Sequence, residues 1–136
     1  NDLNILEVMR ITGLVHKNRM LDPAAFPNDL ILRLATEGSA RALGFEKSGV
    51  LERGASADII LLNTRKSHWI PRHNPAANIV YSSHPGDIDY LICDGRLLLD
   101  RGKLITLDEE RIHYEAEKRA FRMVGKPMSQ VRTYRG

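Results

Sequence analysis

Residues 35–63 read ATEGSARALGFEKSGVLERGASADIILLN and contain the signals that decide the fold. The stretch predicts a helix over residues 36–43 with Thr36 as its N-cap. Gly44 is expected to end this helix, because glycine readily takes the left-handed conformation of a helix C-terminus. Residues 57–62 then predict a strand that is apolar at successive positions, which is typical of a strand covered on both faces. The chain therefore passes here from helix to sheet.

The second half of the chain predicts further antiparallel strands. The strongest signal is the pair Asp94-Gly95 between the apolar runs 88–93 and 96–99, because Asp-Gly favours the type I′ turn of a two-residue hairpin. Two more short strands are predicted, over residues 79–81 and 103–105.

Helices are predicted on both sides of this sheet. The first begins after Asp2 as N-cap, and a second, from Leu30, is expected to break at Gly38. The sequence Thr106-Leu107-Asp108-Glu109 is typical of a capping box and predicts a terminal helix. That helix is expected to end near Gly125.

The composition indicates a soluble globular chain: of 136 residues, 43% are hydrophobic and 27% are charged. No signal peptide or membrane span is predicted, so a cytoplasmic location is expected. Cys93 is the only cysteine, which excludes a disulfide within the chain, and it is expected to pack within a strand. The net charge of +3 comes from basic residues after position 110. We interpret them as a solvated helix face.

The histidines predict no metal centre of their own. None belongs to an H-x-H pair or an H-E-x-x-H motif. His68 and His73 lie in a predicted loop, and His84 lies in a turn beside Ser82 and Ser83 without a nucleophile-elbow motif. We expect no catalytic and no metal-ligating residue in this chain, and we expect Asp58 to be structural.

Three elements occur in order at fixed spacing: an A-T-x-x-x-A-x-A-L-G helix end, a G-x-L-x-x-G turn and an A-D-hydrophobic strand. The chain supplies them with Ala35, Thr36, Ala40, Ala42, Leu43 and Gly44; with Gly49, Leu51 and Gly54; and with Ala57 and Asp58 before residues 59–62. This pattern resembles the metal-dependent amidohydrolase superfamily, in its chlorohydrolase and adenosine-derivative deaminase branch.

The resemblance implies an α+β fragment of a larger enzyme. Residues 1–48 would be the last helices of a (β/α)8 barrel, residues 49–107 the C-terminal part of a composite β-sandwich, and residues 108–136 a terminal helix and tail. Asn1 and Asp2 would lie near the substrate, just after a metal-binding aspartate that precedes the chain.

The resemblance also implies the chemistry of the full-length protein. It would be a hydrolase with zinc or another divalent metal that deaminates or dechlorinates a small heterocycle, such as S-adenosylhomocysteine, methylthioadenosine, guanine or a chlorinated triazine. The fragment alone is expected to be inactive and to hold no cofactor. Its expected partners are the rest of the barrel and further copies in a homo-oligomer, with neither nucleic acid nor membrane.

An alternative hypothesis is a non-catalytic, β-rich interaction module. That module would need a complete hydrophobic core within these residues. The fragment hypothesis instead predicts exposed apolar faces on the helices between Leu3 and Leu34, and association of the isolated chain.

Overall fold

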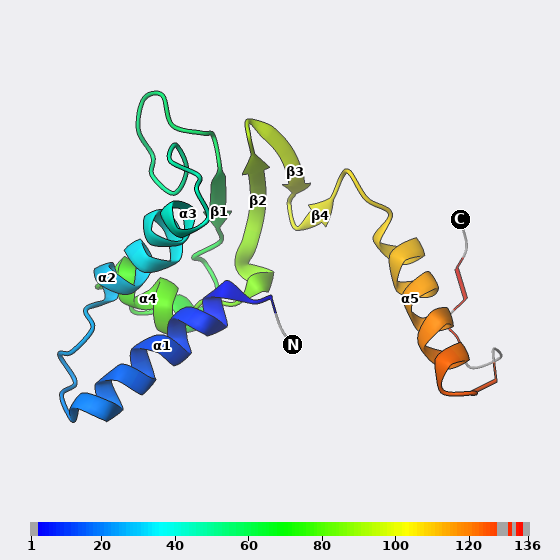
Figure 1. The fold of residues 1–136 in the computed structure, drawn as a ribbon, viewed down its shortest axis with the longest axis horizontal. Helices are drawn as coiled ribbons and strands as arrows, with labels where there is room; N and C mark the ends of the chain where they lie inside the picture. The colour runs from blue at the N-terminus through cyan, green and yellow to red at the C-terminus, as the bar shows by residue number, and fades with distance from the viewer. Residues whose placement is uncertain (1–2, 128–130, 132, 135–136) are drawn as a thin grey trace.

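The computed structural model describes residues 3–127, 131 and 133–134. These residues form a group of packed helices, a four-stranded sheet and a C-terminal helix that stands apart from both (Figure 1). The helices of the packed group are α1 (Ile5–Met20), α2 (Asn28–Arg33), the π-helical turn η1 (Leu34–Gly38), α3 (Ser39–Ala42) and α4 (Pro75–Tyr81). No helix of the described part is both long and apolar enough to cross a membrane.

The first helix has its N-cap at Asn4, two residues after the predicted cap at Asp2. The side chain of Asn4 caps α1 by accepting a hydrogen bond of 3.3 Å from the backbone N–H of Glu7. Asp2, the predicted cap, lies outside the described residues. The helix ends at Leu21, whose φ of 51° is left-handed.

The second helical segment is continuous from Asn28 to Ala42, so the predicted break at Gly38 and the predicted cap at Thr36 are both wrong. The Thr36 hydroxyl donates a 2.9 Å hydrogen bond to the carbonyl of Leu32 one turn earlier, as threonine does inside helices. A π-helical turn over Leu34–Gly38 widens the segment in its middle. The predicted end is confirmed, because Gly44 has a φ of 81°.

A small core joins α1, α2 and α4 through Leu6, Met9, Ile31 and Val80, all at most 5% exposed. The predicted strand over residues 79–81 is wrong, because these residues are the last turn of α4. The Asn74 side chain caps that helix by accepting from the N–H of Ala77, and Pro75 occupies its first turn.

The sheet contains β1 (Ile59–Leu62), β2 (Ile88–Cys93), β3 (Arg96–Asp100) and β4 (Lys103–Leu104) in this spatial order, with every pair antiparallel. The predicted hairpin is confirmed: Asp94 and Gly95 have φ values of 49° and 74°, both positive as a type I′ turn requires. The predicted cover on both faces of β1 is absent from the described residues, since Ile60 and Leu61 are 46% and 48% exposed.

The C-terminal helix α5 (Glu109–Met123) begins at a different cap from the predicted one. Asp108, rather than Thr106, accepts a 2.9 Å hydrogen bond from the N–H of Arg111. The helix ends just before Gly125, which confirms the predicted end. None of its residues is buried.

Apolar side chains remain uncovered on the helices as well. Ile5, Val8 and Ile11 on α1 are each about half exposed. The described residues thus lack the complete core that the interaction-module hypothesis requires.

Candidate functional site

Asp87 is a buried carboxylate on which four polar contacts of the described residues converge. Its side chain is 1% exposed and lies at the end of the 3-10 turn η3 (Pro85–Asp87), directly before β2. Four groups donate to it: Lys66 Nζ at 2.9 Å, His68 Nε2 at 2.8 Å, Trp69 Nε1 at 3.1 Å and the backbone N–H of His84 at 2.9 Å. We call these five residues the Asp87 cluster.

The electrostatics of this cluster keep Asp87 ionised. Burial alone raises the pKa of a carboxyl group, but the hydrogen bonds from His68, the His84 N–H, Lys66 and Trp69 outweigh it and hold the pKa of Asp87 well below its usual range. A carboxylate only accepts hydrogen bonds, so Nε2 of His68 is the donor of that pair. The cluster is therefore a satisfied buried charge.

The cluster ties two separate parts of the chain together. Lys66, His68 and Trp69 come from the loop and the 3-10 turn η2 (Ser67–Trp69) after β1, whereas Asp87 comes from the turn before β2. Lys66 Nζ also donates to the carbonyl of Gly86 at 2.7 Å. The loop after β1 is thus fastened to the start of the neighbouring strand.

A second contact extends this junction to α1. Arg10 donates at 3.0 Å to the carbonyl of Ser83, the residue before His84, and at 2.9 Å to the carboxylate of Glu7. The hydroxyl of Ser83 is buried and donates to the carbonyl of Ile79, so it is engaged in helix α4 and not poised as a nucleophile. His84 lies edge-on to His68, with 5.1 Å between the ring centroids.

Asp58 and Cys93 lie together at the other end of the sheet. Asp58 accepts from the N–H of Asp94 at 2.8 Å and from the hydroxyl of Ser48 at 3.0 Å, and these bonds lower its pKa. Cys93 is exposed, which corrects the prediction that it packs within the strand. Desolvation and the nearby Asp58 charge raise the pKa of the Cys93 thiol, which disfavours the reactive thiolate.

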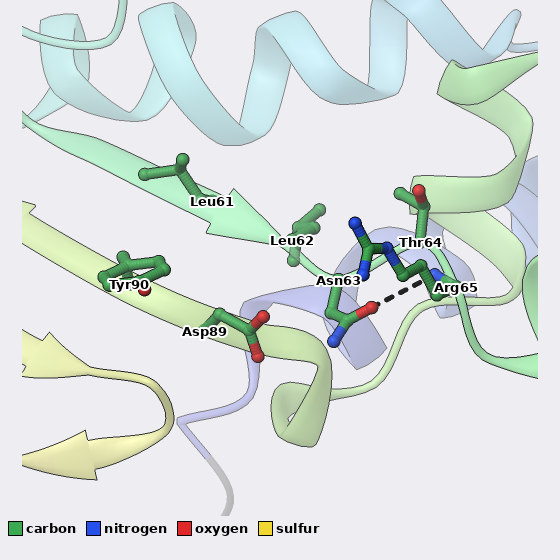
Figure 2. A pocket seen from close by; sticks show the side chains of 7 residues that line it. All are labelled: Leu61, Leu62, Asn63, Thr64, Arg65, Asp89 and Tyr90. Carbon is green, nitrogen blue, oxygen red and sulfur yellow. Dashed lines mark hydrogen bonds between the residues drawn. The ribbon is translucent and has the colours of Figure 1, made fainter.

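A shallow pocket of about 340 Å³ opens where β1 ends beside the start of β2 (Figure 2). Its polar lining includes Arg65 and Asp89, and Asn63 accepts a 3.1 Å hydrogen bond from the N–H of Arg65. The residues that line it include no histidine, cysteine or serine, so the pocket offers neither a nucleophile with its base nor a pair of metal ligands. The lining is Leu61, Leu62, Asn63, Thr64, Arg65, Asp89 and Tyr90.

The structure does not gather the remaining histidines into one site. The ring of His16 stacks on that of Phe26, with 3.9 Å between the ring centroids. His113 lies near Glu109 on α5, and His73 is exposed in the loop before α4. Across residues 3–127, 131 and 133–134, no group of three histidine, cysteine or acidic side chains could hold a metal ion. The described part of the chain therefore does not fit a resident divalent metal. Asn1 and Asp2, the predicted substrate-proximal residues, lie outside the described residues.

Sequence reasoning missed the role of Asp87. One local signal was present, since Asp87 lies in the third position of a turn that Pro85 begins, where an acidic side chain can bond back to the N–H of His84. The other donors come from residues about twenty positions earlier, and no sequence period links them to Asp87.

Comparisons with known proteins agree on one family. Residues 1–98 match the model of the amidohydrolase family. A 5-methylthioadenosine/S-adenosylhomocysteine deaminase of Dictyoglomus thermophilum is 44% identical over 93% of this chain and 30% of its own length.

Solved structures give the same result. An adenosine deaminase from Xanthomonas campestris with bound zinc matches 92% of this chain and 29% of its own, with a TM-score of 0.88 and 26% identity. An atrazine chlorohydrolase from Arthrobacter aurescens TC1, complexed with zinc, matches 79% of this chain and 24% of its own, with a TM-score of 0.70 and 30% identity.

The chain spans less than a third of the length of the relatives that it matches. The match of the family model to residues 1–98 covers well over half of the sequence. The chain belongs to the amidohydrolase family.

Proposed function

We propose that this chain is the C-terminal part of a hydrolytic deaminase of adenosine-type nucleosides. The observation that carries the proposal is the 44% identity to a 5-methylthioadenosine/S-adenosylhomocysteine deaminase over 93% of the chain. In this reaction one water replaces the exocyclic amino group of the purine ring with an oxygen, and ammonia leaves. 5-Methylthioadenosine and S-adenosylhomocysteine are the substrates to test first.

The proposed domain division follows the resemblance. Residues 1–48 would complete a barrel, residues 49–107 a β-sandwich, and residues 108–136 would form the terminal helix and tail. The second segment also contributes α4, which packs against α1 and α2 of the first. Asn1 and Asp2 would lie at the mouth of the active site.

The metal of the full-length protein would be held outside this chain. Zinc or another divalent ion is supported by the bound zinc of two structural neighbours, while the described residues offer no set of three ligands. When bound, such an ion would activate the attacking water. Homo-oligomerisation and a cytoplasmic location stay predictions.

The contribution of this chain would be to position α1. Arg10 fastens the second turn of α1 to the carbonyl of Ser83, and the Asp87 cluster fixes the turn that follows Ser83. Because Asp2 lies only two residues before the Asn4 cap of α1, this junction would help to set where Asn1 and Asp2 lie. Small displacements of positioning groups are costly in catalysis.

The test is a substrate screen with the full-length protein. Purified protein is incubated with zinc and with 5-methylthioadenosine, S-adenosylhomocysteine or adenosine, and ammonia and the deaminated nucleoside are measured together. We expect equal amounts of both products, with a preference for a 5′-substituted nucleoside. Turnover of none of the three nucleosides would overturn the deaminase proposal.

A second candidate function is dechlorination of a chlorinated triazine. It is favoured by the 30% identity and TM-score of 0.70 with the atrazine chlorohydrolase. Release of chloride from atrazine, without release of ammonia from the nucleosides, would support it.

A further inference from the structure

The pocket where β1 ends beside the start of β2 holds two opposite charges, those of Arg65 and Asp89 (Figure 2). Among the described residues, neither the guanidinium of Arg65 nor the carboxylate of Asp89 makes an ion pair or a side-chain hydrogen bond, with each other or with a third group. In Figure 2 the two side chains lie on opposite sides of Asn63. The space between the two charges is therefore open to a ligand that carries both.

The backbone that carries these two side chains is held in place by the Asp87 cluster. The N–H of Asn63 donates to the carbonyl of Asp87 at 2.7 Å, and Oδ1 of Asn63 accepts from the N–H of Arg65 at 3.1 Å. Lys66, the next residue, is bound to the carboxylate of Asp87. Asp89 follows Asp87 by two residues and belongs to β2. Because both backbones are already ordered, a ligand would have to order only the two side chains, which lowers the entropic cost of binding.

The apolar part of the lining comes from Leu61, Leu62 and Tyr90. Successive residues of a regular strand point to opposite faces of the sheet. The pairing of β1 with β2 shifts its register between Leu61 and Leu62, and this irregularity lets both leucines line one pocket. Leu61 is 48% exposed. A ligand in the pocket would thus cover an aliphatic surface as well as two charges.

The lining residues select the chemical class of the ligand. A guanidinium such as that of Arg65 binds a carboxylate through two parallel hydrogen bonds, and the carboxylate of Asp89 accepts from an ammonium group. An anion alone would be repelled by Asp89, and a cation alone would be repelled by Arg65. The volume of about 340 Å³ is at the lower end of the range for small-molecule sites. A small zwitterion with an aliphatic portion meets all of these conditions.

We propose that this pocket binds a free α-amino acid with an aliphatic side chain. The carboxylate of the ligand bonds to Arg65, its ammonium group bonds to Asp89, and its side chain lies on the two leucines. An apolar segment of polypeptide laid over the pocket would cover the leucines, but it would also remove water from two unpaired charges, which is costly. The proposal goes beyond the deamination reaction and requires neither the metal nor turnover.

The first part of the test varies the ligand. Full-length protein is titrated with L-leucine, with N-acetyl-L-leucine, which has no ammonium group, and with L-leucinamide, which has no carboxylate, and the heat of binding is measured by calorimetry. We expect L-leucine to bind with a Kd of about 1 mM or below. Each analogue should bind at least about tenfold more weakly, because it leaves either Asp89 or Arg65 without its charged partner.

The second part of the test varies the protein. Arg65→Gln and Asp89→Asn each remove one charge, whereas Arg72→Gln and Asp94→Asn make the same substitutions at residues that do not line the pocket. We expect each of the first two variants to weaken L-leucine binding at least about fivefold, and each control to change it less than about twofold. In Asp89→Asn, L-leucine and N-acetyl-L-leucine should bind within about twofold of each other, because the partner of the ammonium group is gone.

Three results would overturn the proposal. A wild-type protein that does not bind L-leucine at about 10 mM would show that the pocket is not an amino-acid site. Equal affinities of the wild type for L-leucine and its two analogues would show that the charges do not hold the ligand. A loss of affinity in Arg72→Gln as large as that in Arg65→Gln would place the binding elsewhere. None of these measurements depends on activity, so a protein that binds L-leucine but deaminates no nucleoside would fail the proposed function alone.

Discussion

Replacing Gly13 with alanine tests the packing of α1 against α4. A Cβ atom at this position would lie 2.5 Å from the hydroxyl of Tyr81 and 3.0 Å from Cδ1 of Ile31. The hydroxyl of Tyr81 is buried and has no hydrogen-bond partner among the described residues. Gly13→Ala should therefore force the two helices apart or move the tyrosine ring.

Two opposing terms set the magnitude. Alanine is favoured over glycine inside a helix by about 1 kcal/mol. Overpacking a filled interface costs about 1–3 kcal/mol, and a contact of 2.5 Å falls in the upper part of that range. We expect Gly13→Ala to lower the free energy of unfolding by about 1–2 kcal/mol.

The Tyr81→Phe background separates the gain in helix propensity from the cost of overpacking. Tyr81→Phe removes the atom that a Cβ at position 13 would meet at 2.5 Å, and it leaves contacts of 3.0 and 3.2 Å to the flexible end of Ile31 and to the ring. In that background Gly13→Ala should be nearly neutral, because the gain in helix propensity offsets the weaker crowding. Tyr81→Phe alone should not destabilise, since the lost hydroxyl has no partner among the described residues.

The assay is urea denaturation followed by circular dichroism, with four variants in a double-mutant cycle. The expected coupling between positions 13 and 81 is about 1–2 kcal/mol. Equal effects of Gly13→Ala in both backgrounds, within about 0.3 kcal/mol, would refute the reasoning. A Gly13→Ala variant more stable than the wild type would refute it as well.

Three further predictions concern other parts of the chain. Asp87→Asn should lower the free energy of unfolding by about 1.5–3 kcal/mol in urea denaturation, because the neutral amide replaces a buried carboxylate that accepts charge-assisted hydrogen bonds, and a loss below about 0.5 kcal/mol would contradict this. Because the pKa of Asp87 is lowered on folding, its contribution is present above the ordinary carboxyl pKa and is lost as the pH falls through the folded value. The free energy of unfolding of the wild type should thus fall below about pH 4, and that of Asp87→Asn should fall less over the same pH range. Gly49→Ala should cost clearly more than Gly54→Ala in the same assay. Both glycines have a positive φ, but only a Cβ on Gly49 would meet backbone atoms, those of Thr36 and Glu37, at 2.7 Å, and equal costs would contradict the contact. The isolated 136-residue chain should associate in light scattering through its uncovered apolar faces, whereas a stable monomer would favour the interaction-module hypothesis.

Local signals were sufficient where a short segment fixes its own conformation. Asp94 and Gly95 form the predicted hairpin turn because both can adopt positive φ, and Gly44 ends its helix for the same reason. Residues 79–81 were predicted as a strand from their β-branched and aromatic side chains. The Asn74 cap and the burial of Val80 against α1 and α2 override that propensity.

The candidate site was less predictable because its contacts are distant in sequence. His68 and Asp87 each have an ordinary local environment, and only the pairing of β1 with β2 brings them together. The prediction of Asn1 and Asp2 as substrate-proximal residues stays a prediction. Asp58 was expected to be structural, and its bonds to the Asp94 N–H and Ser48 are of that kind.

The π-helical turn over Leu34–Gly38 has a consequence for how relatives of this chain are aligned. A π-helical turn holds one residue more than the α-helical turn it replaces. A relative that lacks one residue here could close the turn to ordinary α-helix and keep both flanking helices on their present faces, because the wider turn absorbs the extra residue. Gly49, at which an added Cβ would meet backbone atoms of Thr36 and Glu37, lies against the turn that this deletion would narrow. Single-residue gaps between family members are therefore expected to cluster at this turn and to be accompanied by changes at the position of Gly49.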